Sequence, residues 1–306
     1  MIYTVTLNPS VDYIVHLDDL HIGQLHIMKN CAKFPGGKGI NVSRVLRELG
    51  ATSTALGFIG GFTGQFIENW LLKEKIRTDF IKIQDDTRIN IKLKTNLETE
   101  INAAGPNITT EEGQQLLKQI EKLKSDDLLI LSGSKPPSLP EDYYLKIVKQ
   151  ISKTNASFVI DTSSKELLDT LEFSPLLVKP NKEELEEIFG TSMRTDADII
   201  KAGKTLIELG AQHAIVSMGG EGAYLFTRQK IYRGYSPKGQ VKNTVGAGDS
   251  MIAGFIKSFL DTKEVVASFK MGLATGSATA FSDDLATKEK IDQLLDAVKV
   301  EEIQEG

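Results

Sequence analysis

The sequence contains very little cysteine, histidine or tryptophan: 306 residues include one cysteine, four histidines and one tryptophan. The single cysteine, Cys31, excludes an intrachain disulfide, and with so few histidines it also excludes cysteine-rich zinc modules. No apolar run approaches the ~20 residues that a transmembrane helix requires, and no basic region precedes the first apolar residues as in a signal peptide. We therefore expect a cytoplasmic protein without a membrane partner.

An excess of basic charge is also lacking. The chain has 36 Lys and Arg residues against 41 Asp and Glu residues, which gives a net charge of -5. Such a balance, without a long basic run, does not favour binding to nucleic acid or to an anionic membrane surface. An anionic ligand would have to be held by a few local donors.

Short apolar runs alternate with amphipathic helical patterns along the chain. Buried strands are expected at Leu128–Ser132 and Ser157–Asp161, and Val42, Val45 and Leu46 recur at helical spacing. This alternation predicts a layered α/β domain with a mostly parallel sheet. Further strands are expected at residues 2–7, 54–58, 176–179 and 213–217.

Two stretches, residues 10–34 and 87–102, interrupt this alternation. In the second stretch, Ile89, Ile91 and Leu93 alternate with polar residues, which is typical of a sheet with one dry face and one wet face. We predict that the two stretches form a small β subdomain that serves as a lid or as an oligomer contact. The main α/β domain would then comprise residues 1–9, 35–86 and 103–306.

The strongest local signal is the small-residue loop Gly246-Ala247-Gly248, which runs into an apolar helix. Its glycines allow a ligand to approach the backbone, and consecutive N–H groups at a helix N-terminus suit a phosphate. Asp249 follows in the first turn, where its carboxylate could take a proton from a hydroxyl that attacks the phosphate. The alternative is an ordinary helix start with an Asp at a favoured position and glycines for the turn.

A second glycine cluster begins a helix at residues 36–41. Gly37, Lys38 and Asn41 combine close backbone approach with a cation and a carboxamide, a set that suits a polyhydroxylated substrate. Asp12 follows the first strand, at the type of strand-to-loop switch where open α/β sheets bind ligands. Taken alone, Asp12 could equally form a turn and Lys38 could equally be a solvated surface residue.

Three other segments carry weaker signals. Arg88, at the start of a predicted strand, could bind a phosphate through two nitrogens, although a lone edge-strand arginine is more often solvated. Asn181 and Glu184 lie on one face at a helix start, where they could orient waters around Mg²⁺ or simply cap the helix. Residues 216–222 predict a strand followed by a glycine turn, which suits a hairpin as well as a nucleotide bed.

Taken together and in this order, these motifs resemble those of the ribokinase-like sugar kinases of the phosphofructokinase B family, over essentially the whole chain. The resemblance implies a three-layer α/β/α fold with a mostly parallel sheet and a small β lid. It implies ATP and Mg²⁺ as cofactors, a sugar phosphate as the small-molecule partner, and a homodimer formed through the lid. The matching segments are residues 8–12, 36–39, 181–184 and 246–249.

The resemblance also implies a role for each site residue. Asp249 would be the catalytic base, and the backbone of Gly246, Ala247 and Gly248 would be the anion hole for the migrating phosphoryl group. Arg88 would hold the phosphate already present on the substrate. The sugar itself would be held by Asp12, Gly37, Lys38, Asn41 and Ser134.

On the nucleotide side, Asn181 and Glu184 would position Mg²⁺ and phosphate, with Glu184 acting on the metal through water. The ATP bed would be lined by Ser217, Gly219, Gly222, Gly276 and Ser277. One departure concerns the lid, where many relatives carry an arginine and this chain has Ile27. Binding of the substrate phosphate would then depend more on Arg88 and Lys38.

The reaction implied is in-line transfer of the γ-phosphoryl group of ATP to the 6-hydroxyl of fructose 1-phosphate, giving fructose 1,6-bisphosphate. Tagatose 6-phosphate and fructose 6-phosphate are alternative acceptors within the same family. A non-catalytic sugar-phosphate sensor is an alternative of another class, because a fold alone does not fix function. Asp249 and the two glycine loops argue against the sensor, which has no need of a base.

Overall fold

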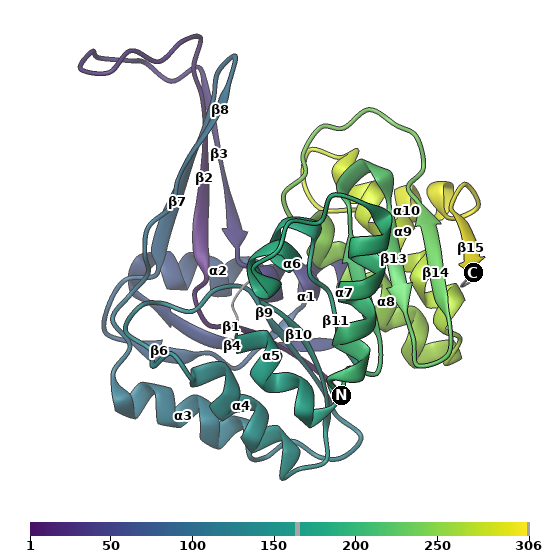
Figure 1. Cartoon of the computed structure of the whole chain (residues 1–306). Helices are drawn as coiled ribbons and strands as arrows, with labels where there is room; N and C mark the ends of the chain where they lie inside the picture. Colours follow the sequence, from purple (N-terminus) through teal and green to yellow (C-terminus); the bar gives the residue numbers. More distant parts are fainter. Residues whose placement is uncertain (163–165, 305–306) are drawn as a thin grey trace.

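The computed structural model describes residues 1–162 and 166–304, and a large sheet forms the centre of this part of the chain (Figure 1). Within the described residues the sheet has 11 strands, in the order β15-β14-β13-β12-β11-β10-β9-β1-β4-β5, with β6 beside β4. At its middle, β1 (Ile2–Thr6) pairs in parallel with β9 (Leu128–Ser132) and β4 (Ser53–Gly60). The other parallel strands are β5 (Arg77–Thr78), β6 (Ile81–Ile83), β10 (Ser157–Asp161), β11 (Leu177–Val178) and β12 (Ala214–Ser217).

One edge of the sheet is antiparallel. There β12 continues into β13 (Ala223–Phe226), β14 (Ile231–Tyr235) and β15 (Lys299–Ile303). The sequence pattern did not predict β15, because this edge strand is largely exposed and has no buried apolar run. The α/β prediction with a mostly parallel sheet is nevertheless confirmed.

Helices cover both faces of the sheet. In the buried strand β9, Leu129 and Leu131 point into one core, whereas Leu128 and Ile130 point into the other. The first core is completed by α3 (Thr110–Ile120), α4 (Tyr143–Ser152), α5 (Glu166–Thr170), α6 (Lys182–Phe189) and α7 (Asp196–Glu208), with the 3-10 turn η1 (Leu171–Phe173). The second core is completed by α1 (Lys38–Glu48), α8 (Ala247–Thr262), α9 (Val265–Ala280) and α10 (Lys288–Leu295). The three-layer prediction is therefore confirmed.

The helix starts follow from local sequence. At α3, Thr109 accepts a hydrogen bond from the N–H of Glu112, and the Glu112 carboxylate accepts one from the N–H of Thr109. This reciprocal capping box satisfies two N–H groups that have no partner inside the helix, and the sequence spacing predicted it. The helix α2 (Gly61–Lys73) packs through Ile67 and Leu71 on a third, smaller core near the base of the second sheet.

A second sheet of four strands projects from the body in Figure 1. Its order is β3 (Asn30–Gly36), β2 (Ser10–His16), β7 (Arg88–Lys94) and β8 (Glu98–Ile101). We refer to these strands as the lid sheet. They come from the two interrupting stretches of the sequence, although β3 continues to Gly36, two residues past the predicted boundary. The division into two domains stays a prediction, and residues 163–165 and 305–306 of its main domain lie outside the described residues.

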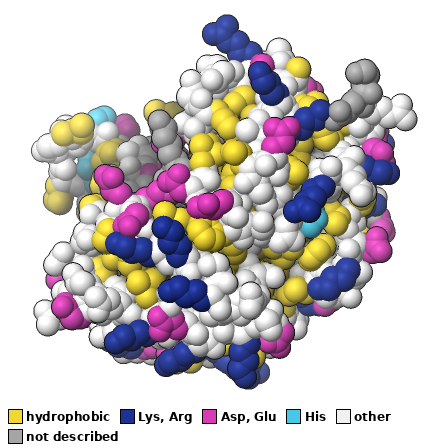
Figure 2. Space-filling view, turned by 60° about the horizontal axis from the view of Figure 1, so that its bottom comes forward, with side chains coloured by type: hydrophobic (Ala, Val, Ile, Leu, Met, Phe, Trp, Pro, Cys, Tyr) yellow, Lys and Arg dark blue, Asp and Glu magenta, His cyan; other side chains and the backbone are white. Residues whose placement is uncertain are grey.

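One face of the molecule carries charged side chains of both signs (Figure 2). Figure 2 shows one face on which Lys and Arg side chains are interspersed with Asp and Glu side chains and with small apolar areas. This face presents no field of a single sign to a partner. None of the helices in the described ranges combines the length and the hydrophobicity of a membrane span.

Candidate functional site

A cleft of about 1420 Å³ lies where the lid sheet meets the carboxyl ends of the parallel strands. Its lining combines Asp12 of the lid sheet, Asp161 at the end of β10, and the first turns of α1, α6 and α8. Carboxyl ends of parallel strands are where open α/β sheets bind their ligands. The cleft brings together nearly every predicted site residue, namely Asp12, Gly37, Lys38, Asn41, Arg88, Ser134, Asn181, Glu184, Ser217, Gly219, Gly246, Ala247, Gly248, Asp249, Gly276 and Ser277.

Gly222 is the exception, since it is absent from the lining of the cleft. It follows the 3-10 turn η2 (Gly219–Glu221) with a φ of +99°, and a Cβ there would lie 2.1 Å from the carbonyl oxygen of Gly234. Only glycine tolerates both conditions. The role of Gly222 in an ATP bed stays a prediction, and its lack of a side chain allows the close turn between β12 and β13.

Asp249 lies in the first turn of α8 and is 5% exposed. Its Oδ2 accepts a 2.8 Å hydrogen bond from the carboxamide nitrogen of Asn41. Burial, followed by repulsion from the Asp161 carboxylate, raises the pKa of Asp249 to about 6, against the opposing effects of Lys38 and Asn41. A carboxylate with a pKa in this range can accept a proton near neutral pH and pass it on readily.

The loop ahead of Asp249 has the shape of an anion site. Gly246 has a φ of +79°, which glycine adopts without strain, and α8 begins at the next residue. The ammonium group of Lys179 lies 3.0 Å from the position that a Cβ on Gly248 would occupy. A helix N-terminus and a buried cation thus face the same small volume, and both attract negative charge.

Asp161 is the centre of a charge cluster that the sequence analysis missed. Its carboxylate, 2% exposed, lies 3.2 Å from the Nζ of Lys38 and 3.4 Å from the Nζ of Lys179. Burial alone would raise the pKa of Asp161, but Lys179 and Lys38 lower it below its usual value. The available signal was its position as a carboxylate at the end of a predicted buried strand.

Lys38 is therefore not a solvated surface lysine. Besides Asp161, its Nζ lies 3.4 Å from Oε1 of Glu184. Burial lowers the pKa of Lys38, but the Asp161, Glu184 and Asp249 carboxylates more than offset this and hold the pKa above its ordinary value. The ammonium group stays charged at the centre of the cleft.

Asn181 and Glu184 form a capping box at the start of α6. Asn181 accepts a 2.7 Å hydrogen bond from the N–H of Glu184, and Oε2 of Glu184 accepts a 2.9 Å bond from the N–H of Asn181. Glu184 can therefore offer only Oε1 to the cleft without uncapping the helix. Across the described residues, no group of three or more His, Cys, Asp or Glu side chains could hold a metal ion.

The Asp12 side chain is fixed by its neighbours on the lid sheet. Its Oδ1 accepts hydrogen bonds from Ser10 Oγ at 2.7 Å and from Asn90 Nδ2 at 3.1 Å. This arrangement leaves Oδ2 for a ligand. Asn90 was not predicted as a site residue, although it lines the same cleft.

Two cations lie at the lid end of the cleft, Arg88 and Lys92. The terminal nitrogens of Arg88 donate to the carbonyl oxygens of Ala103 at 2.7 Å and Asn8 at 3.1 Å. Lys92, which the sequence analysis missed, is 7% exposed and lies 3.2 Å from Glu100. Ile27, by contrast, is 87% exposed and is not among the residues that line the cleft.

The opposite end of the cleft is formed by backbone turns. The N–H of Ser217, at the end of β12, donates to the carbonyl oxygen of Pro180 at 3.1 Å, which ties β12 to the loop before α6. Gly276 and Ser277 approach from α9. The larger side chains of Met218 and Phe281 also line the cleft.

Comparisons with known proteins find relatives that match nearly the whole chain. The model of the pfkB family carbohydrate kinases matches residues 5–291. The chain is 49% identical to a Bacillus subtilis 1-phosphofructokinase, covering 98% of this chain and 99% of that protein. It is 38% identical to a Bacillus licheniformis D-tagatose-1-phosphate kinase, covering 98% and 99%. A crystal structure of Escherichia coli phosphofructokinase-2 in complex with substrates and products superposes with a TM-score of 0.92 at 26% identity, covering 97% and 98%.

Proposed function

Because this chain belongs to the pfkB family of carbohydrate kinases, we propose that it transfers the γ-phosphoryl group of ATP to the 6-hydroxyl of fructose 1-phosphate. The product would be fructose 1,6-bisphosphate. The observation that carries this proposal is the position of Asp249, a buried carboxylate directly after the Gly246-Ala247-Gly248 loop and inside a cleft with cations at its lid end. This arrangement offers a base, an anion site and a sugar-phosphate site in one cleft.

In this proposal Asp249 takes the proton of the attacking hydroxyl. Asn41 holds one oxygen of the carboxylate, so the other oxygen is free to face the acceptor. The N–H groups at the start of α8 and the ammonium group of Lys179 would stabilise the charge on the phosphoryl oxygens during transfer. The protein thus mainly positions two anions and offsets their repulsion.

The sugar phosphate would lie with its hydroxyl near Asp249 and its phosphate near the lid sheet. Asp12 would accept hydroxyl hydrogen bonds through Oδ2, and Gly37, Lys38 and Ser134 line the path between the two ends. Arg88 would contribute the N–H groups that its two carbonyl partners leave free, and Lys92 adds a second cation. A phosphate at this end would therefore have two positive partners despite Ile27.

ATP would lie at the opposite end, against Ser217, Gly219, Gly276 and Ser277. The two carboxylates nearest to Lys38, those of Asp161 and Glu184, are hard oxygen donors. Both oxygens of Asp161 are paired with the ammonium groups of Lys38 and Lys179, whereas the Glu184 carboxylate faces the cleft with Oε1. Such donors fit a hydrated Mg²⁺, held by Glu184 through water. When bound, the ion would neutralise charge on the nucleotide phosphates.

The choice of substrate is tested by a coupled ADP-release assay with Mg-ATP. The acceptors are fructose 1-phosphate, fructose 6-phosphate, tagatose 6-phosphate, tagatose 1-phosphate and unphosphorylated fructose, and kcat/KM is measured for each. We expect fructose 1-phosphate to give the highest value, because the 49% identical relative carries that activity in its name. A higher value for a 6-phosphate sugar would overturn the substrate assignment, and no turnover of any acceptor would overturn the kinase reaction.

We also propose that two copies of the chain associate through the lid. Large apolar side chains are exposed there, including Ile22 at 100%, Leu25 at 92% and Leu97 at 77%. Gathered apolar side chains of this kind typically mark an interface. Sedimentation of the wild type and of Leu97→Glu tests this, and a monomeric wild type would contradict it.

The exposed, unpaired Cys31 suits the reducing cytoplasm in which we propose the enzyme acts.

A further inference from the structure

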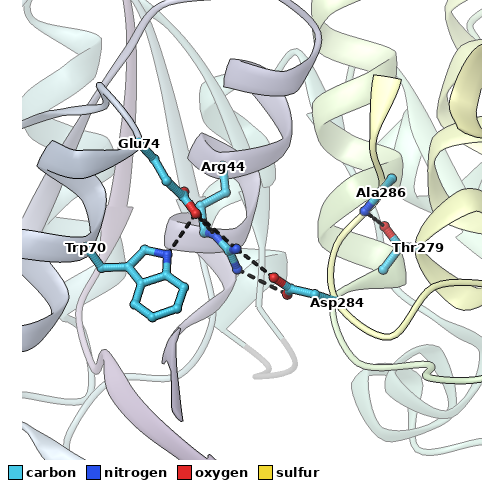
Figure 3. A network of polar contacts seen from close by, with 6 residues as sticks. All are labelled: Arg44, Trp70, Glu74, Thr279, Asp284 and Ala286. Carbon is cyan, nitrogen blue, oxygen red and sulfur yellow. Dashed lines mark hydrogen bonds and ion pairs between the residues drawn. The ribbon is translucent and has the colours of Figure 1, made fainter. Parts of the chain in front are cut away.

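Arg44 lies on α1, one turn after Asn41, and its guanidinium is 10% exposed although it does not line the cleft. It is held between two carboxylates (Figure 3). On one side, Glu74 accepts from Nε at 3.1 and 3.3 Å and from Nη2 at 3.2 Å. On the other side, Asp284 accepts from Nη1 at 3.2 Å and from Nη2 at 2.7 Å.

The Glu74 side of this network is fixed to α2. Oε1 of Glu74 also accepts a 2.7 Å hydrogen bond from the indole nitrogen of Trp70, whose ring lies 5.9 Å from the Arg44 guanidinium carbon. Burial lowers the pKa of Arg44, and Asp284 and Glu74 raise it above its usual value, so the guanidinium stays charged. Arg44 is thus a charged side chain held firmly by Glu74, and its second partner is Asp284.

Asp284 belongs to the loop between α9 and α10, and this loop lies behind the anion site. The side chain of Leu285 would be 2.7 Å from a Cβ on Gly246. Thr279 accepts a 2.9 Å bond from the N–H of Ala286 (Figure 3). The Thr279 hydroxyl is also 2.7 Å from that of Ser250, the residue after Asp249. Movement of this loop would therefore move the support of Gly246.

We propose that Arg44 is a positioning residue for phosphoryl transfer, which fixes the loop of Asp284 and Leu285 against the Gly246 turn. Through Asn41 the same helix also holds Asp249, so α1 contacts both the base and the loop behind the anion site. This inference rests on the proposed function of those two groups. A planar guanidinium can bind two carboxylates at fixed angles, and a lysine cannot.

The test compares Arg44→Lys and Asp284→Asn with Asp283→Asn as a matched control. Asp283 is the neighbouring carboxylate of the same loop, but its side chain is 88% exposed and its partner is Lys242. We expect kcat to fall about tenfold or more in the first two variants, because anion-site donors act only when correctly positioned. KM for ATP and for the sugar phosphate should stay within about twofold, and the control should keep the kcat of the wild type.

If the ion pair only stabilises the fold, its loss will lower the midpoint of thermal unfolding but will not change kcat at temperatures well below that midpoint. Both quantities are therefore measured for each variant, together with the double variant, whose kcat should be no lower than that of either single variant if the two residues act as a pair. Unchanged kcat in Asp284→Asn, or equal losses in Asp283→Asn, would overturn the role of Arg44. Full activity of Asp249→Asn would instead overturn the proposed function itself, so the two failures are distinguishable.

Discussion

The carboxamide of Asn41 donates a hydrogen bond of 2.8 Å to Oδ2 of Asp249, although 208 residues separate the two in the sequence. The bond joins the beginning of α1 to the beginning of α8, which approach each other at the carboxyl edge of the sheet. The resemblance predicted Asn41 as a sugar ligand. The structure adds that it stabilises the charged form of the carboxylate that we propose as the base.

The activity of the wild type should depend on pH through Asp249. A base must be deprotonated, and the pKa of Asp249 is raised to about 6 by burial and by Asp161. We expect kcat/KM for the sugar phosphate to be constant above this value and to fall about tenfold per pH unit below it. Initial rates between pH 4.5 and 8.5 at fixed ionic strength measure this. An acid limb near pH 4 would contradict the assignment.

The variant Asn41→Ala should move this acid limb to higher pH. It removes a hydrogen bond to the charged carboxylate, worth about 1.5–3 kcal/mol, so protonation of Asp249 becomes easier. We expect a displacement of about one pH unit or more in the kcat/KM profile. A lower plateau with an unmoved limb would mean that Asn41 contacts only the sugar.

Asp249→Asn should abolish turnover while sparing the nucleotide site. General-base catalysis typically contributes about 10²- to 10⁴-fold, and a carboxamide cannot accept the proton. We expect kcat to fall by that range, with the dissociation constant of Mg-ATP within about threefold of the wild type by titration calorimetry. Asp126→Asn, an exposed carboxylate after α3, is the control and should keep full activity. Equal kcat in the two variants would remove Asp249 from the mechanism.

Asp161→Asn should destabilise the fold. The carboxylate is buried between Lys38 and Lys179, and its loss would leave the almost fully buried charge of Lys179 without its partner. Breaking a buried pair in this way typically costs about 3–5 kcal/mol. Urea denaturation of this variant and of the exposed control Asp126→Asn gives the difference in the free energy of unfolding. A difference below about 0.5 kcal/mol would argue that the cluster contributes no stability.

Arg88→Ala should weaken binding of the sugar phosphate selectively. A hydrogen bond from a charged group contributes about 1.5–3 kcal/mol, so KM for the sugar phosphate should rise roughly tenfold or more while KM for ATP is unchanged. Arg228→Ala, an exposed arginine in the turn between β13 and β14, is the matched control. If the two variants have the same KM for the sugar phosphate, the bonds of Arg88 to Asn8 and Ala103 are structural only.

The strands whose bounds were predicted to the residue lie in the middle of the larger sheet. Leu128–Ser132 and Ser157–Asp161 have the same bounds in the sequence prediction and in the structure, since a continuous apolar run is sufficient to define them. The edge strand β15 contains two glutamates and owes its strand conformation to pairing with β14. No local pattern encodes such a partner.

The residues of the candidate site also fall into two groups, those that a local motif predicts and those that only the fold brings together. Gly246 to Asp249 and Asn181 to Glu184 are short local motifs, and they could be found without knowledge of the fold. Asp161 and Lys179 belong to the site because β10 and β11 are neighbours in the sheet. The order of the strands in a sheet cannot be read from the residues of a single strand, so this pair could not be predicted. Gly222 was placed in the ATP bed by the resemblance, and the structure adds that its positive φ and the nearby carbonyl oxygen of Gly234 require a glycine there.

Among the strands of the larger sheet β1 is synthesised first, yet it lies in the middle of that sheet. One of its edges pairs with β4 by residue 60, and the other must wait for β9, which ends at residue 132. Over this interval of synthesis the nascent chain carries an open apolar edge that invites pairing with other chains. Asp249 is synthesised more than 100 residues later, so the proposed base reaches the cleft only after the middle of the sheet is complete.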